Sequence, residues 1–91
     1  MKNIVLEQQE YSVMKDYREG FDAEAVKERF TDYFKPFDYI VGDWSYGKVR
    51  LKGFYKTGHA NAKKMNDIAN VDSYIKQSCA FDCRYFILEK K

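Results

Sequence analysis

The stretch that decides the fold runs from Phe37 to Tyr55 and reads FDYIVGDWSYGKVRLKGFY. It contains two strand-forming runs, and the segment Ser45-Tyr46-Gly47 between them is typical of a tight turn. Two such runs on either side of a turn predict an antiparallel β-hairpin. In the second strand, alternation puts Val49, Leu51 and Gly53 on one face. The other face carries Lys48, Arg50, Lys52 and Phe54.

Aromatic residues lie close to these cations, since Trp44 and Tyr46 stand near the turn and Phe54 is in line with the lysines. Alternating cations can follow phosphates, and rings beside them can stack on unpaired bases. The triplet 52–54 also resembles the opening of the central strand of the RNA-recognition motif, although residues 55–57 do not continue that pattern. The alternative is a solvated outer face whose lysines protect a sheet edge, with Trp44 and Phe54 in the core.

Charge is distributed unevenly along the chain. The total is +2, from sixteen basic and fourteen acidic residues, which is too small to imply nucleic acid by itself. Residues 1–47 hold six basic and ten acidic groups, whereas residues 48–64 hold six basic groups and no acid. The basic character therefore belongs to the second hairpin strand and to the loop 56–66 that follows it, which includes Lys63 and Lys64.

The remaining elements are predicted from periodicity and from residues that begin or end helices. Short strands are expected at 3–6 and 11–14, and a final strand at 84–88. Asp22 is a good N-cap for a helix that Pro36 ends, and a second helix is expected within 67–78. The order is β-β-α-β-β-α-β, which predicts an α+β fold with an antiparallel sheet of four to five strands and two helices. Without the first strand, this order matches the ferredoxin-like fold.

Length and composition predict one domain covering residues 1–91, because a chain of this size with 45% hydrophobic residues can bury a core without a metal. No run of about eighteen apolar residues is present, so no membrane span is expected. The start, MKNIVLEQQE, lacks the long apolar region of a secretory signal. We therefore expect a cytoplasmic protein.

Two cysteines, Cys79 and Cys83, form a C-x3-C pair without a second pair in the chain, which does not fit a zinc site. They are a candidate thiol pair, or two small residues packed in the core of a reduced protein. The single histidine, His59, stands in a loop without an adjacent nucleophile or acid. Asp43 is expected to make a turn hydrogen bond. We predict neither a metal site, a cofactor nor a catalytic set.

Two blocks, FDYIVGDWSYGKVRLKGF (37–54) and CAFDCRYFILEK (79–90), resemble the YutD-like family of small bacterial proteins. The resemblance extends from about Tyr11 to Glu89. It implies a cytosolic protein, and it implies no catalytic residues, because the family has no established biochemical role.

The sequence thus favours a binding or adaptor domain that uses the hairpin and the basic loop to engage an acidic protein or RNA. Self-association is also compatible with the uneven charge. The alternative is a small thiol-redox protein or enzyme centred on Cys79 and Cys83. The candidate binding residues are Trp44, Tyr46, Lys48, Arg50, Lys52, Phe54, Lys63 and Lys64.

Overall fold

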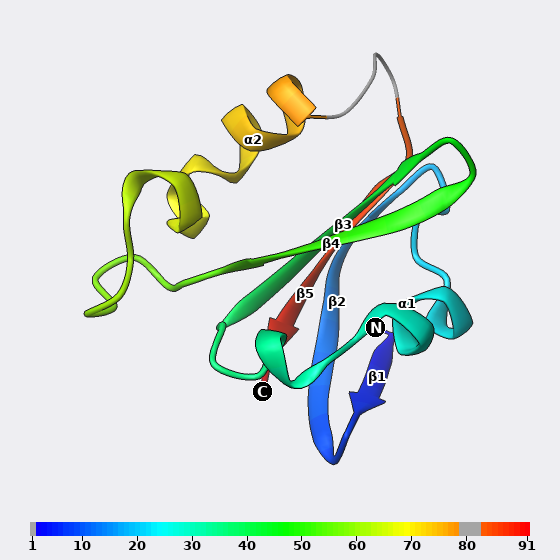
Figure 1. The fold of residues 1–91 in the computed structure, drawn as a ribbon, viewed down its shortest axis with the longest axis horizontal. Helices are drawn as coiled ribbons and strands as arrows, with labels where there is room; N and C mark the ends of the chain where they lie inside the picture. The colour runs from blue at the N-terminus through cyan, green and yellow to red at the C-terminus, as the bar shows by residue number, and fades with distance from the viewer. Residues whose placement is uncertain (1, 79–82) are drawn as a thin grey trace.

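The computed structural model describes residues 2–78 and 83–91. Within these residues the chain forms a twisted antiparallel sheet in the order β1-β2-β5-β3-β4, shown in Figure 1. The strands are β1 (Asn3–Leu6), β2 (Gln9–Tyr17), β3 (Tyr39–Ser45), β4 (Lys48–Phe54) and β5 (Tyr85–Lys90). The helices are α1 (Ala23–Arg29) and α2 (Val71–Ser78), with 3-10 turns at Asp32–Phe34, Lys64–Asn66 and Ile68–Asn70.

The predicted α+β class and element order are confirmed. The two helices, however, lie on opposite faces of the sheet (Figure 1). Strand alternation explains this, because neighbouring residues of β3 point in opposite directions: Ile40 packs in the α1 cluster and Val41 in the α2 cluster. A ferredoxin-like fold keeps both helices on one face, so the arrangement departs from that expectation.

The two hydrophobic clusters differ in size. The α1 cluster holds ten buried residues, including Tyr11, Val26 and Phe86, whereas the α2 cluster holds only three. Val26 of α1 is fully buried, while the hydrophobic residues of α2 are only half-buried. The sheet is therefore anchored mainly through its α1 face.

The first helix is shorter than predicted. Asp22 is its N-cap, as expected, and accepts hydrogen bonds from the backbone N–H groups of Glu24 and Ala25. The helix ends at Arg29 rather than near Pro36, because Phe30 is extended, with ψ at 133°. Phe30 then packs edge-on against the ring of Tyr11. Core packing thus interrupts a stripe that helical periodicity alone would continue to Pro36.

The observed bounds of two other elements also differ from the predicted ones. β2 continues to Tyr17, beyond the predicted end at Met14, because a bulge between Val13 and Lys15 breaks the alternation. The second helix proper begins at Val71, after a 3-10 turn capped by Asp67. No helix among the described residues is long and apolar enough to cross a membrane.

Candidate functional site

The register of the hairpin determines which residue Arg50 contacts. Arg50 stands directly opposite Asp43, and its Nε and Nη2 atoms donate to the two carboxylate oxygens at 2.9 and 2.8 Å. Asp43 is only 1% exposed, so the expected turn role is wrong and the residue is a buried acceptor. The hydrogen bond to Asp43 raises the pKa of Arg50. Arg50 therefore neutralises an internal carboxylate, which reduces the charge that the strand offers to a partner.

Phe54 does not supply the contact area that the sequence suggested. Its ring is completely buried and packs edge-on against Tyr74 of α2, with 5.4 Å between the ring centroids. The ammonium of Lys52 lies 5.5 Å from the centroids of both rings. Such cation–π contacts orient Lys52 beside α2.

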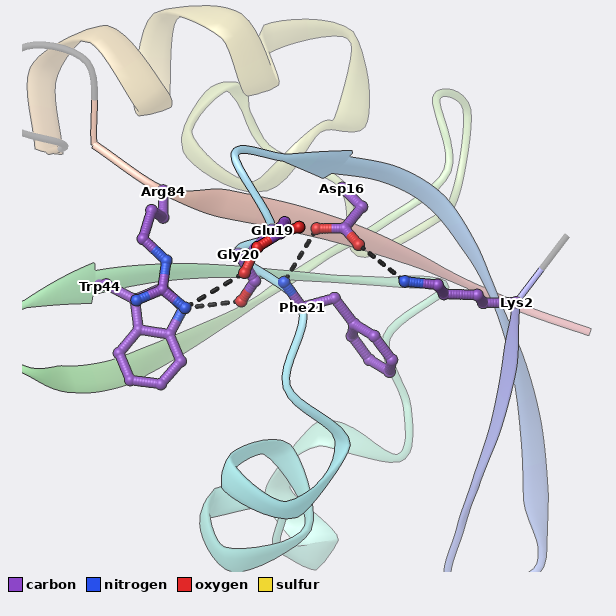
Figure 2. Close-up of polar contacts among 7 residues, drawn as sticks. All are labelled: Lys2, Asp16, Glu19, Gly20, Phe21, Trp44 and Arg84. Carbon is purple, nitrogen blue, oxygen red and sulfur yellow. Dashed lines mark hydrogen bonds and ion pairs between the residues drawn. The ribbon is translucent and has the colours of Figure 1, made fainter.

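Trp44 lies on the opposite face from the lysines of β4, because alternation sends its side chain to the α1 side, where it packs against the larger cluster. Its Nε1–H donates to the carbonyl oxygen of Gly20 at 2.6 Å, and the guanidinium of Arg84 lies 4.5 Å from its ring centroid (Figure 2). Trp44 therefore holds the chain between β2 and α1 and is not a free stacking platform.

Polar contacts complete this anchor (Figure 2). Arg84 donates to the carbonyl of Glu19 at 3.1 Å, and Asp16 accepts from the backbone N–H of Phe21 at 3.0 Å. A Cβ on Gly20 would lie 2.6 Å from the backbone of Tyr85, so only glycine fits this approach. The contacts of Trp44 and Arg84 therefore have a structural role in the fold.

A groove at the other end of β4 brings together lysines that are distant in the sequence. Its volume is about 740 Å³. Lys63 and Lys64 are exposed, and Met65 beside them is 71% exposed. The lining contains no acidic residue; it consists of Lys52, Lys63, Lys64, Met65, Asn70, Ser73, Tyr74 and Gln77.

The position of this groove depends on a bridge at the end of β4. Tyr55 donates from its N–H to the carbonyl of Asn66 at 2.7 Å and accepts from the N–H of Ile68 at 3.0 Å. The amide of Asn70 then donates to the carbonyl of Lys64 at 3.0 Å. These bonds fold the segment back onto the sheet edge, so that its two lysines lie on the same groove as Lys52.

Asp67 closes the same segment. Its carboxylate accepts from Thr57 Oγ1 at 2.6 Å and from the N–H of Ala69 at 2.9 Å. The hydrogen bond from Thr57, followed by that from Ala69, lowers the pKa of Asp67. The sequence pattern identified Lys63 and Lys64 but not the hydrogen bonds of Asp67 that hold their segment in place. The signal present was a short polar side chain ahead of the helix, in the position of a cap.

Tyr46 and Lys48 stand apart from the groove, at the hairpin turn. Tyr46 is fully exposed and has a φ of 53°, followed by Gly47 at 76°, which are the positive angles of a tight hairpin turn. β4 spans roughly 20 Å at about 3.3 Å per residue. The predicted binding residues therefore lie in three places. Tyr46 and Lys48 stand at the hairpin turn, and Lys52, Lys63 and Lys64 line the basic groove. The other three, Trp44, Arg50 and Phe54, make structural contacts.

The thiol hypothesis is not resolved by the structure, because Cys79 lies outside the described residues; it stays a prediction. His59 stacks on Tyr55 with 4.4 Å between the ring centroids, so it packs against the base of the loop. In the part of the chain that the structure describes, no three His, Cys, Asp or Glu side chains gather in a way that could hold a metal ion.

Comparison with known proteins gives one consistent result. The profile of a family described as "Putative antitoxin YutD-like" matches residues 5–89. "Putative antitoxin YutD" of Bacillus subtilis (strain 168) is 39% identical over 87 residues, which cover 96% of each chain. The solution NMR structure of protein yutD from B. subtilis matches with a TM-score of 0.83 and 37% identity, covering all of this chain and 83% of that one. These matches confirm the resemblance carried by residues 37–54 and 79–90.

Proposed function

Because this chain belongs to the YutD-like family, we propose that it is a non-catalytic protein that binds an acidic partner protein in its basic groove. The observation that carries the proposal is the convergence of Lys52, Lys63 and Lys64 on one concave surface without a carboxylate in its lining. Positive charge held on one side of a cleft attracts an acidic partner and orients its approach.

The lining favours a protein over RNA as the occupant. Binding of single-stranded RNA relies on exposed rings beside the cations, yet Phe54 is buried and Trp44 lies on the other face. The groove instead offers the exposed side chain of Met65 and part of the Tyr74 ring. Methionine and tyrosine are enriched at protein interfaces, where their apolar surface is buried.

The description of the Bacillus relative supports the same direction. It is described as a putative antitoxin, and an antitoxin counteracts a toxin, in the simplest case by binding it. We extend this role to the present chain as part of the proposal: the partner is an acidic protein whose activity is blocked when it occupies the groove.

The test compares two charge-matched variants. Lys63→Gln/Lys64→Gln removes two charges from the groove, and Lys27→Gln/Arg29→Gln removes two from α1 on the opposite face. Proteins captured from a nuclease-treated lysate on each immobilised variant are identified, purified and titrated against it by calorimetry. We expect affinity to fall about tenfold or more in the groove variant only, and to weaken as salt increases.

Equal affinities of the two variants for every purified partner would contradict the proposal. An oligouridylate that binds in a way that depends on Lys63 and Lys64, with a steep salt dependence, in the absence of any protein partner would assign the groove to RNA instead.

A further inference from the structure

Tyr46 stands at the tip of the hairpin formed by β3 and β4, with its ring entirely in water. It is fully exposed, so the fold buries none of its side chain. The other exposed tyrosines of the described residues pack against neighbouring rings: Tyr17 stacks on Tyr85, and Tyr33 packs edge-on against Phe34. An aromatic side chain left wholly in water contributes nothing to the stability of the fold, because no apolar surface is buried.

The backbone conformation of Tyr46 is unfavourable for a bulky residue. Its φ of 53° lies in the left-handed region, which glycine and asparagine adopt more readily. Four other non-glycine residues in the described part of the chain have a positive φ, and all four are polar or charged: Glu7, Gln8, Arg18 and Glu19. The described tight turns otherwise use polar residues at such positions. A ring that strains the backbone and stabilises nothing in the fold indicates a functional role.

The tip and the basic groove lie at opposite ends of β4 (Figure 1). The seven residues of β4 span roughly 20 Å at about 3.3 Å per residue. A stable protein interface covers about 800 Å² on each partner, which corresponds to a patch about 30 Å across. One folded partner seated in the groove therefore reaches the tip. Lys48 is exposed and lies next to the turn on the same face as Lys52, so the positive charge continues toward Tyr46.

We propose that the acidic partner makes a second contact at the hairpin tip, where the ring of Tyr46 enters an apolar pocket of that protein. This inference rests on the proposed function and adds a contact outside the groove. Tyrosine is enriched among the residues that carry most of the binding energy of an interface, because its ring covers a large area with only two rotatable bonds. The two-residue turn holds the ring in place, so little conformational freedom is lost on binding.

The test uses a substitution that separates binding from folding. Tyr46→Asn gives the turn the Asn-Gly sequence that this geometry prefers, so the midpoint of urea denaturation should stay unchanged or rise. Affinity for the purified partner that requires Lys63 and Lys64, measured by calorimetry, should fall about tenfold or more. Tyr46→Phe retains the ring and should bind the partner more tightly than Tyr46→Asn does.

Tyr33→Asn is the matched control, because Tyr33 is an exposed tyrosine on the α1 side of the sheet. Its ring packs against Phe37, which covers Gly53 on that side. This variant should lower the midpoint of denaturation, since ring contacts are lost, and leave the affinity unchanged. Brief nitration with tetranitromethane, mapped by mass spectrometry, should modify Tyr46 in the free protein but not in the complex, while Tyr33 reacts equally in both.

Two outcomes would overturn the contact at the tip: a groove-dependent partner that binds Tyr46→Asn as tightly as the native protein, or nitration of Tyr46 at the same rate in the free and bound protein. Neither affects the proposed function, which is judged by the loss of affinity in Lys63→Gln/Lys64→Gln. If no captured protein requires Lys63 and Lys64, the proposed function fails and this inference fails with it. Protection of Tyr46 by an oligouridylate alone would also overturn it, because the occupant would then be RNA.

Discussion

Arg50 stands on the outer surface of β4, and its guanidinium is held by the buried carboxylate of Asp43. Strand alternation correctly placed Arg50 with Lys48 and Lys52, but it did not reveal the residue opposite. Counting back from a two-residue turn pairs 45 with 48 and 43 with 50, so the signal was in the sequence. At the residue scale, cross-strand register separates a structural cation from cations that are available to a partner.

Replacement of Arg50 tests this separation. Arg50→Ala leaves the Asp43 carboxylate buried without its bidentate donor, and we expect the free energy of unfolding to fall by about 1–3 kcal/mol. Lys48→Ala removes an exposed cation from the same strand and should change it by less than about 0.5 kcal/mol. Urea denaturation measures both values, and equal losses would show that the pair with Asp43 does not stabilise the fold.

At the scale of elements, the segment from Tyr55 to Asn70 builds the groove with two 3-10 turns but without a strand or an α-helix. It contains few apolar residues, and hydrogen bonds determine its shape. These bonds join Asp67 to Thr57, Asn70 to Lys64, and Tyr55 to residues 66 and 68. Sequence patterns predict a surface loop for such a segment, because hydrogen bonds between polar groups produce no periodic spacing of hydrophobic residues. Together these hydrogen bonds nevertheless hold the segment that carries Lys63 and Lys64.

Asp67 gives this segment a defined pH dependence. The folded protein holds the pKa of Asp67 below its ordinary value of 3.8, so the carboxylate stabilises the fold above that value. The contribution is lost as the pH falls through the lowered pKa. At neutral pH we expect Asp67→Asn to speed exchange of the Ala69 amide several-fold, and the difference from the native protein to vanish at low pH.

Glu28→Gln on α1 is the control, since it removes one negative charge from an exposed helix position. It should leave exchange at Ala69 unchanged. A difference between the native protein and Asp67→Asn that persists unchanged below the lowered pKa would rule out the carboxylate as its cause.

At the scale of the whole molecule, the two faces of the sheet are covered unequally. The α1 face encloses ten buried residues, and the α2 face encloses three. The side that carries the groove is therefore the less tightly packed one, and α2, which supplies part of its wall, contributes no buried residue among 71–77. Binding surfaces are commonly built on such less stable parts of a fold.

We expect native-state hydrogen exchange to show this difference. Amides of α2 should exchange through local opening, with free energies well below that of global unfolding, because few buried contacts hold the helix. Amides of the central strands β3 and β5 should exchange only through global unfolding. Equal protection of α2 and of the central strands would show that the smaller cluster is as stable as the larger one.

Charge is the other property of the whole molecule. Three of the six cations in residues 48–64 line the groove, whereas residues 1–47 carry a net charge of −4. The acidic partner that we propose would thus be attracted to the groove and repelled by the acidic groups of residues 1–47, which would favour a single orientation of approach.

The sequence by itself determined the hairpin, the alternation of its side chains, the Asp22 cap, the element order and the family, because turn residues and periodicity act over a few neighbouring positions. Tertiary structure alone decided that the helices take opposite faces, that Phe54 is buried against Tyr74 of α2, and that Lys52 meets Lys63 and Lys64. Those outcomes depend on contacts between distant segments, above all the bridge between Tyr55 and Asp67. The free energy of such contacts is settled only when the whole chain packs, and no local pattern records it.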